Sequence, residues 1–315
     1  MSSAEIPALL ESALLQRESL KNCTNAVRLV NGFGDGLDGL VLEQYDTHFV
    51  AQIFDASWFG QYEVLAGFVR KLGGRYFIVK DRTETASSKP DAIKATVWID
   101  EAPAQTEVVE NGLRFSVDLN DTLNSGLFLD MRTNRKMVAA LSAGKKILNG
   151  FAYTCSFGVY CRAAGAASVT NVDISKKVLE RGRANYALNS IVPTPNEFIR
   201  ADVVEYLERA VKKDNRFDGI ILDPPSFARH EGKVFSVRKD MAGLIAMAFK
   251  VLNPGGFLFV ATNFSGLIPE DLEGMIEQGS GGHDVHEMTQ YTQDMDFPGS
   301  GSMQESYLAA VLAKV

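Results

Sequence analysis

The amino-acid sequence predicts an α/β protein in which a mostly parallel sheet follows a smaller α+β domain. Three observations support this prediction. The chain has 315 residues, which is enough for two domains. From Lys145 onward, apolar runs of strand length alternate with helical patterns, as in consecutive βαβ units. Around residues 26–54, apolar and polar residues alternate between Gly and Asp turns, which indicates antiparallel strands.

The N-terminal part begins with a predicted amphipathic helix over residues 6–20, and the antiparallel meander follows it. Residues 58–74 then show helical spacing and end on Gly-Gly, and residues 75–81 are typical of a strand. An Asn-Gly pair at 111–112 lies between two β-rich runs and predicts a hairpin. We therefore expect an N-terminal α+β domain over 1–104, a connecting β-hairpin over 105–128 and the parallel-sheet domain over 129–315.

The C-terminal part contains six predicted strands separated by helices. The long helical pattern from residue 237 stops on Asn-Pro-Gly-Gly, as a helix that must turn back into a strand often does. The predicted strands cover 145–152, 168–175, 197–203, 217–227, 255–264 and 306–315.

Composition limits the class of protein. Hydrophobic residues make up 46% and charged residues 23%, and no apolar run reaches the roughly 18 residues that a membrane helix needs. The first 20 residues carry Glu where a secretory signal would be basic, so we expect a cytoplasmic protein without a membrane partner. Three cysteines and four histidines lack the spacing of a zinc site, and we expect no metal.

The net charge of −7 argues against a protein that coats nucleic acid through charge alone, because neutralisation of phosphates supplies most of that affinity. It leaves open an enzyme that gathers its Lys and Arg residues on one face.

Asp223, Pro224 and Pro225 follow a strand that reads as buried. The two prolines fix φ and remove two backbone donors, so the loop is stiff and cannot extend the sheet. In an α/β protein, ligands bind at the carboxyl ends of the strands. This loop is therefore a candidate for the chemistry.

Three further strand ends carry features of a cofactor site. The first strand runs into "NGFAYTCSFG", which has only Gly150 and Gly158 and is not the GxGxxG dinucleotide motif. Asp173, about 20 residues on, ends the second strand at the position from which a carboxylate binds ribose hydroxyls. Asp202 follows the third strand, placed to meet an adenine amino group. Each Asp could instead cap a helix. Together these features predict a nucleoside cofactor without a diphosphate.

Five stretches resemble one family: "GLFLDMRTNR", "LNGFAYTCSFGVY", "VDIS", "RADV" and "ILDPPSF". They are similar to the class I S-adenosylmethionine (SAM) methyltransferases of the 23S rRNA cytosine-5 group, the RlmI-like proteins. "RLVNGFGDGLDGLVLEQYD" is similar to the middle domain of that group, so the resemblance covers most of the chain. It implies a Rossmann-like class I methyltransferase sheet, SAM as cofactor and rRNA as the substrate class, with the N-terminal domain on the substrate side.

The resemblance also implies site residues. Phe151 to Ser156 would surround the methionine part of SAM, Asp173 the ribose and Asp202 the adenine, with Asp223 beside the transferable methyl group. Arg132 would contact the methionine carboxylate, with a surface ion pair as the alternative. The implied cofactor contacts are Arg132, Asn149, Gly150, Phe151, Ala152, Tyr153, Thr154, Cys155, Ser156, Asp173, Ile174, Ser175, Asn189, Asp202, Val203 and Asp223. The implied catalytic residues are Asp223, Pro224, Pro225 and Phe227.

The sequence departs from the family in three places. We expect the usual N-terminal PUA domain of the family to be absent, with only the short helix near Ile6 to Leu20 before the meander. Cys155 and Ser156 stand where Gly-Gly is usual. Asn263 and Ser265 stand in "ATNFSG", where a Thr-Cys-Ser is expected.

The missing thiol bears on the reaction, because cytosine C5 becomes nucleophilic only when a cysteine adds to the neighbouring ring carbon. Cys155 belongs to the loop that would hold the cofactor, Cys161 to an apolar helix and Cys23 to a remote segment. We expect none of them to be the nucleophile. An exocyclic amino group attacked directly is the alternative acceptor, although the aromatic residue stands one position later than in the usual amino-methylating motif.

Phe227 has two interpretations, a stacking surface for a flipped-out base or an anchor that packs the loop onto the sheet. Arg229, His230 and Lys233 follow it and could meet phosphate, or could form a solvated face.

We expect a SAM-dependent methyltransferase acting on a base in RNA, of the rRNA class. The alternatives are a small-molecule or protein methyltransferase, and a SAM-binding protein without turnover. An NAD-dependent dehydrogenase is disfavoured by the absent GxGxxG motif. The sequence leaves open whether the protein forms a homodimer.

Overall fold

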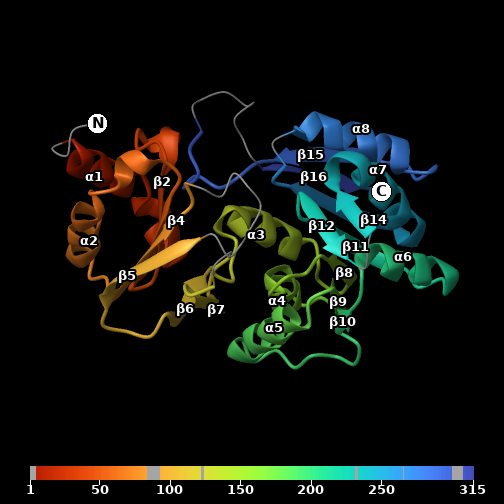
Figure 1. The fold of residues 1–315 in the computed structure, drawn as a ribbon. Helices are drawn as coiled ribbons and strands as arrows, with labels where there is room; N and C mark the ends of the chain where they lie inside the picture. Colours follow the sequence, from red (N-terminus) through yellow and green to blue (C-terminus); the bar gives the residue numbers. More distant parts are fainter. Residues whose placement is uncertain (1–4, 84–92, 122–123, 231–232, 265, 300–307) are drawn as a thin grey trace. The chain divides into compact units, whose positions relative to one another are not determined.

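The computed structural model describes residues 5–83, 93–121, 124–230, 233–264, 266–299 and 308–315. The chain divides into two compact units. Unit 1 comprises Met1–Arg132 together with Asp294–Met303, and unit 2 comprises Thr133–Gln293 together with Gln304–Val315. Figure 1 shows the course of the chain through both units.

Unit 1 is built on a five-stranded sheet in the order β1-β2-β3-β4-β5. The first three strands form the antiparallel meander predicted from the sequence, β4 pairs parallel with β3, and β5 pairs antiparallel with β4. The elements of unit 1 are α1 Ile6–Gln16, η1 Glu18–Asn22, β1 Ala26–Asn31, η2 Gly32–Asp35, β2 Leu40–Tyr45, β3 His48–Ile53, η3 Ala56–Trp58, α2 Tyr62–Lys71, β4 Tyr76–Asp81, β5 Lys94–Asp100, β6 Gln105–Glu110, β7 Leu113–Asp118 and η5 Leu129–Met131.

One face of this sheet is covered by α1 and α2, which pack their apolar sides into a common core (Figure 1). Leu10 of α1 and Leu65 of α2 are buried there against Phe49 and Phe77 of the sheet. The predicted hairpin is present as β6 and β7. Its turn residues Asn111 and Gly112 both have positive φ, which is the geometry that an Asn-Gly hairpin turn requires.

Unit 2 contains a seven-stranded sheet in the order β10-β9-β8-β11-β14-β16-β15. All pairings are parallel except those that β16 makes with β14 and β15. The elements from α3 to the C-terminus are α3 Arg132–Ala140, β8 Lys146–Gly150, α4 Ser156–Ala163, β9 Ser168–Asp173, α5 Lys176–Leu188, β10 Phe198–Arg200, α6 Val203–Lys212, β11 Phe217–Leu222, β12 Phe227–His230, β13 Lys233–Ser236, α7 Val237–Val251, β14 Leu252–Thr262, α8 Pro269–Gly279, β15 Glu287–Tyr291 and β16 Ala309–Lys314.

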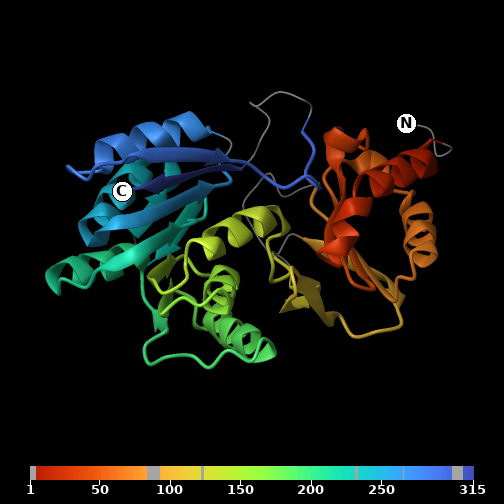
Figure 2. The ribbon, with the colours of Figure 1, turned by 180° about the vertical axis from the view of Figure 1, so that it is seen from behind.

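Helices cover both faces of this sheet, as a parallel sheet with buried strands requires. On one face, α6, α7 and α8 share a core with inward residues of the strands such as Leu148 and Val260. On the other face, Phe157 of α4 packs against Phe259, the neighbour of Val260 that points the opposite way. Figure 2 shows the sheet with its helices from behind. The α/β fold class predicted from the sequence is confirmed.

The helix α3 and the strands β12, β13 and β15 were not expected from the sequence. Residues 227–230 and 233–236 pair antiparallel as β12 and β13, where the sequence indicated a loop after the prolines. The edge strand β15 is also new, because its "EMTQY" carries few apolar residues and pairs on one side only, with β16. Periodicity detects strands that bury an apolar face and is weak for such an edge.

The observed division also differs from the predicted domain limits. The first boundary lies after Arg132, and the segment Asp294–Met303, between β15 and β16, belongs to unit 1. The reason is a set of contacts made within unit 1 by Asp296 and Phe297. Asp296 accepts hydrogen bonds from the backbone N–H of Arg28 and from Arg132, while Phe297 lies under the Arg28 guanidinium.

Candidate cofactor and acceptor site

The order of the strands in unit 2 reverses beside β8, which pairs with β9 on one side and β11 on the other. In open α/β sheets a ligand binds outside the carboxyl ends of the strands at such a point. The three strands end in register, since Gly150 pairs with both Val172 and Leu222. Phe151, Asp173 and Asp223 therefore come together at one edge of the sheet.

The loop after β8, residues 151–155, has an unusual backbone. Phe151, Tyr153 and Cys155 all have positive φ, between 47° and 60°, and alternate with Ala152 and Thr154. A left-handed conformation costs a residue with a side chain about 1–2 kcal/mol, so other contacts must hold the loop in place. We call residues 151–155 the first loop.

Asp173 is one of the residues that hold the first loop. One of its carboxylate oxygens accepts the N–H of Tyr153 at 2.9 Å, and the other accepts the N–H of Ser175 at 2.9 Å. Burial raises the pKa of Asp173, and these backbone N–H groups act in the opposite direction. The carboxylate is half-buried, and an ionised carboxylate offers about four acceptor positions, more than the backbone N–H groups of Tyr153, Ile174 and Ser175 use.

Asp202 is the N-cap of α6, as the capping alternative predicted. Its side chain accepts the N–H of Glu205 at 3.1 Å. Capping uses one carboxylate oxygen, and the expected contact of Asp202 with adenine stays a prediction. Ser175 likewise caps α5 by accepting the N–H of Val178.

Asp223 is the first residue after β11, and the two prolines carry the chain away from the sheet. Pro224 is buried and Pro225 is exposed. The hydroxyl of Ser226 donates to the side-chain oxygen of Asn263, at 2.8 Å, and so joins this loop to the residues after β14. The position expected of a catalytic thiol thus carries Asn263, whose side-chain oxygen accepts a hydrogen bond from the Asp223 loop.

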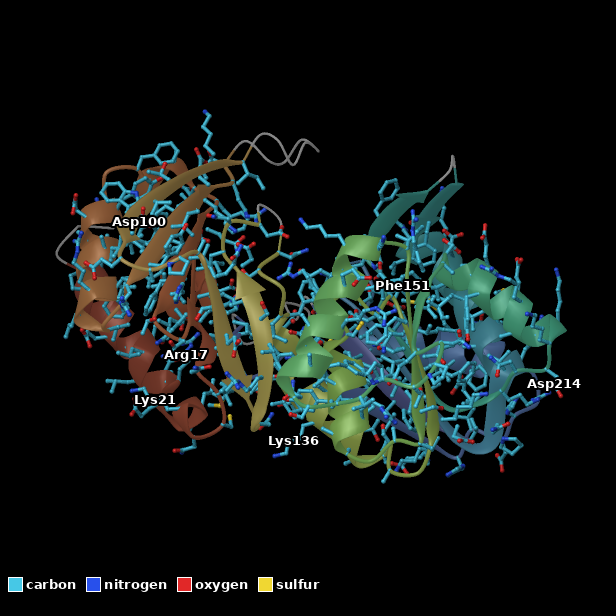
Figure 3. All side chains as sticks on the ribbon, turned by 90° about the horizontal axis from the view of Figure 1, so that it is seen from below. Arg17, Lys21, Asp100, Lys136, Phe151 and Asp214 are labelled. Atoms are coloured by element: carbon cyan, nitrogen blue, oxygen red, sulfur yellow. The ribbon has the colours of Figure 1, made fainter. Side chains whose placement is uncertain are left out.

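The β12–β13 hairpin lies against the first loop. Phe235 of β13 packs on Phe151, with ring centroids 5.8 Å apart, and Figure 3 labels Phe151 among the side chains of unit 2. Phe227, at the start of β12, leaves 52% of its surface exposed. That exposure favours a contact surface over an anchor in the core.

Arg132 lies in a buried cluster of charges inside unit 1. Its terminal nitrogens donate to Asp294, to both oxygens of Asp296 and to the carbonyl of Ala26, and its Nε faces Glu110 at 3.6 Å. Burial would lower the pKa of Arg132, but the bonds and charge of Asp296 raise it overall. Both terminal nitrogens are thus paired within unit 1, the Nε is buried facing Glu110, and only 1% of the residue surface is exposed, so these ion pairs are not at the surface. We therefore leave Arg132 out of the candidate site.

Three other residues that the resemblance implied have side chains or positions away from the strand ends. The amide of Asn149 is buried and donates to Asn171 on the neighbouring strand. Val203 is buried in the core, against Gly150. Asn189 follows the last residue of α5, at the end of the helix opposite the turn next to Asp173, and its amide donates to the carbonyl of Asn185 at 2.8 Å. These placements do not support direct cofactor contacts.

The remaining members of the implied set lie at the edge of the sheet. Gly150 ends β8, Ala152 and Thr154 are buried in the first loop, and Ser156 begins α4. Ile174 follows Asp173 and is half-buried.

The cysteines of unit 2 are both buried. Cys155 has no exposed surface, and burial, together with the nearby charge of Asp173, raises its pKa well above the usual value. Burial also raises the pKa of Cys161 to about 12. A buried thiol that stays protonated at neutral pH is a poor nucleophile.

Several expectations fall outside the described residues. The side chains of Arg229, His230 and Lys233 are not described, and Ser265 is not described at all. Within the described part of the chain, no three His, Cys, Asp or Glu side chains gather as a metal site would require. Among the described helices, none has the length and apolar character needed to span a membrane.

The fold of unit 2 is that of a class I methyltransferase, and comparison with known proteins agrees. A model of the S-adenosylmethionine-dependent methyltransferase family matches residues 68–303. The chain therefore belongs to the SAM-dependent methyltransferase family, and its cofactor is SAM. The expected family and cofactor are confirmed.

Two relatives are named as ribosomal RNA methyltransferases. Ribosomal RNA large subunit methyltransferase I of Aeromonas salmonicida is 33% identical over 262 residues, which are 82% of this chain and 65% of the relative. The protein of the same name from Shewanella amazonensis is 31% identical over 295 residues, or 91% of this chain and 74% of the relative. The chain thus spans about two thirds of the length of the Aeromonas protein.

The fold is also similar to those of solved methyltransferase structures. A crystal structure of SMU.776 complexed with SAH has a TM-score of 0.89 and 28% identity, covering 100% of this chain and 82% of the other. A Streptococcus mutans protein proposed to be a SAM-dependent methyltransferase has a TM-score of 0.87 and 26% identity, with the same coverage.

The site fits SAM by its chemistry. The first loop carries side chains where a pyrophosphate would need glycines for close approach, and SAM contains no phosphate. The half-buried carboxylate of Asp173 stands at the end of the second strand, as a ribose acceptor should.

Proposed function

We propose that this protein transfers the methyl group of SAM to a base in RNA, with ribosomal RNA as the substrate class. The observation that carries this proposal is the position of Asp223, which leaves the sheet directly beside the first loop. Relatives named for ribosomal RNA methylation support the choice of substrate. The proposal implies work in the cytoplasm, where ribosomal RNA is found.

In this proposal the first loop and Asp173 bind and orient the cofactor. SAM, when bound, supplies an electrophilic methyl group on its sulfonium. The stiff Asp223-Pro224-Pro225 loop presents a carboxylate to the acceptor, and Phe227 offers an exposed ring on which a flipped-out base can stack.

We further propose that the acceptor is a base nitrogen attacked directly, without a covalent protein–base adduct. Methylation of cytosine C5 needs a thiolate in the acceptor site. The two cysteines of unit 2 are buried, and the position after β14 carries Asn263, whose amide can hydrogen-bond a base but cannot add to its ring.

The proposed activity is tested by incubating the protein with labelled SAM and bulk RNA from a strain that lacks it, followed by nucleoside analysis. We expect one labelled base in ribosomal RNA from the wild type, and none from Asp223→Ala. That variant should keep its fold and most of its SAM affinity, because Asp223 lies on the acceptor side.

A small-molecule or protein acceptor is the competing function, and the net charge of −7 favours it. Label that appears in protein or in small molecules, and not in RNA, would replace the RNA proposal. Wild-type turnover by Asp223→Ala would show that the proline loop is only structural.

A further inference from the structure

We propose that helix α5 holds the first loop in its binding conformation, through the side chain of Asn185 and the bare Cα of Gly182. Neither residue belongs to the expected cofactor contacts. Both would act as positioning residues for SAM, and this inference rests on the binding of SAM at the first loop.

Asn185 makes the polar contact. Its side-chain amide donates to the carbonyl of Thr154 at 3.0 Å, and both residues are buried, with 1% of their surface exposed. The Thr154 carbonyl lies between the left-handed residues Tyr153 and Cys155. Without Asn185 this buried carbonyl loses the hydrogen bond from the Asn185 amide, and a loop that moves outward can replace that bond with one from water.

Gly182 makes the packing contact, three residues earlier on the same face of α5. A Cβ at this position would lie 2.4 Å from the Sγ of Cys155 and 3.0 Å from its Cβ. No carbon can approach a sulfur so closely, so any side chain here must displace Cys155. Gly182 is in a regular helix without positive φ, and space alone therefore requires the glycine.

These contacts explain how the first loop, which contains no glycine and is preceded by Gly150, keeps its left-handed backbone conformation. The first loop has three left-handed residues with side chains. Asp173 holds it at Tyr153, Asn185 holds it at Thr154, and Gly182 leaves the space that Cys155 fills. The last two contacts come from one face of helix α5.

The test compares SAM affinity, by calorimetry, across a set of full-length variants. Gly182→Ala should bind SAM about tenfold more weakly or worse, because the displaced loop must return for binding and overpacking resists it. Gly243→Ala is the matched control, since Gly243 is in helix α7 of the same unit with open space around its Cα. It should bind SAM like the wild type.

The decisive variant is the double substitution Gly182→Ala with Cys155→Gly. It removes the side chain that the new methyl group strikes, and glycine accepts the φ of 60° at position 155. We expect it to recover most of the lost affinity. Asn185→Ala should raise the KM for SAM about fivefold or more while kcat at saturating SAM stays within about twofold.

The outcomes separate this inference from the proposed function. If the wild type binds no SAM, the assignment of the site itself fails. If the wild type binds SAM but Gly182→Ala binds it equally well, or the double variant recovers nothing, the positioning role of α5 is overturned. Thermal melting of each variant without SAM identifies any that has merely unfolded.

Discussion

At the scale of single residues, the site depends on which polar groups are buried and what they contact. The carboxylate of Asp173, which we expect to bind the ribose, also accepts a hydrogen bond from the backbone N–H of Tyr153. Cys155 has the opposite character, since its thiol is buried against α5 and is kept protonated. Position in the tertiary structure therefore gives two neighbouring polar side chains quite different chemistry.

Replacing Asp173 with Ala should weaken SAM binding by about 1.5–3 kcal/mol, the usual cost of losing a charged hydrogen-bond partner. Asp173→Asn, which keeps one acceptor for the Tyr153 N–H, should lose less. Calorimetry with SAM measures both, and NAD should not bind to any of the three proteins. Unchanged affinity in the Ala variant would mean that Asp173 does not contact the ribose.

Cys155→Ser should retain substantial methyl transfer, with any loss appearing as weaker SAM binding. The reason is that a buried, protonated thiol beneath the loop cannot add to a base. RNA containing 5-fluorocytosine should accordingly not trap the protein. A denaturant-resistant complex that disappears in Cys155→Ser would restore the cytosine C5 mechanism.

Because of Lys80 in unit 1, we expect the free energy of unfolding to depend on pH. Burial and the nearby charge of Arg82 lower its pKa to about 8, and its ammonium donates to the carbonyl of Asp121 at 2.6 Å. Between pH 8 and the ordinary pKa of about 10.4, the unfolded chain binds a proton here that the folded chain does not, so stability rises with pH.

Urea unfolding of the wild type and of Lys80→Met measures this effect. The wild type should gain free energy of unfolding relative to the variant between about pH 7.5 and 9.5, while the titration of thiols and tyrosines cancels in the difference. A difference that does not change with pH would show that Lys80 keeps an ordinary pKa.

At the scale of elements, the site is assembled from strand ends and from the segments that brace them. Gly150 and Leu222 are paired, which places the first loop beside the Asp223 loop. Phe235 of the β12–β13 hairpin covers Phe151, and the Ser226–Asn263 hydrogen bond ties the proline loop to the end of β14. Each loop is thus fixed by a neighbouring element as well as by its own sequence.

At the scale of the whole molecule, the residues from Asp294 onward, between β15 and β16, belong to unit 1 through buried charges. Asp296 has no exposed surface and accepts hydrogen bonds from Arg28 and Arg132, and Arg17 binds both Asp35 and the carbonyl of Asp296. Figure 3 labels Arg17 in this unit. The cluster therefore joins residues more than 250 positions apart in the sequence.

Removing Asp296 should strongly destabilise unit 1. Asp296→Ala leaves the buried Arg132 short of a counter-charge, and we expect a loss of about 3–5 kcal/mol in the free energy of unfolding. The control is Glu107→Ala, which breaks the exposed pair with Arg114 and should cost less than about 1 kcal/mol. Equal losses in urea unfolding would show that the buried cluster contributes no more than a surface pair.

The sequence by itself determined the class of fold and the family. The patterns that predicted them are local: the alternation of strands and helices, the Asn111-Gly112 turn and the acids after successive strands. Local patterns can be recognised directly in the sequence. The expected positions of Phe151, Asp173 and Asp223 at one edge followed from these patterns, because parallel strands share a carboxyl end.

Only the tertiary structure decided the contacts of Arg132, Cys155 and Asn185. Arg132 is paired with Asp294 and Asp296, which lie more than 160 positions away. Cys155 faces a glycine of α5, and Asn185 reaches a carbonyl 31 residues before it. Which side chain is buried and which partner it meets depend on contacts between distant segments, and no local pattern encodes those contacts.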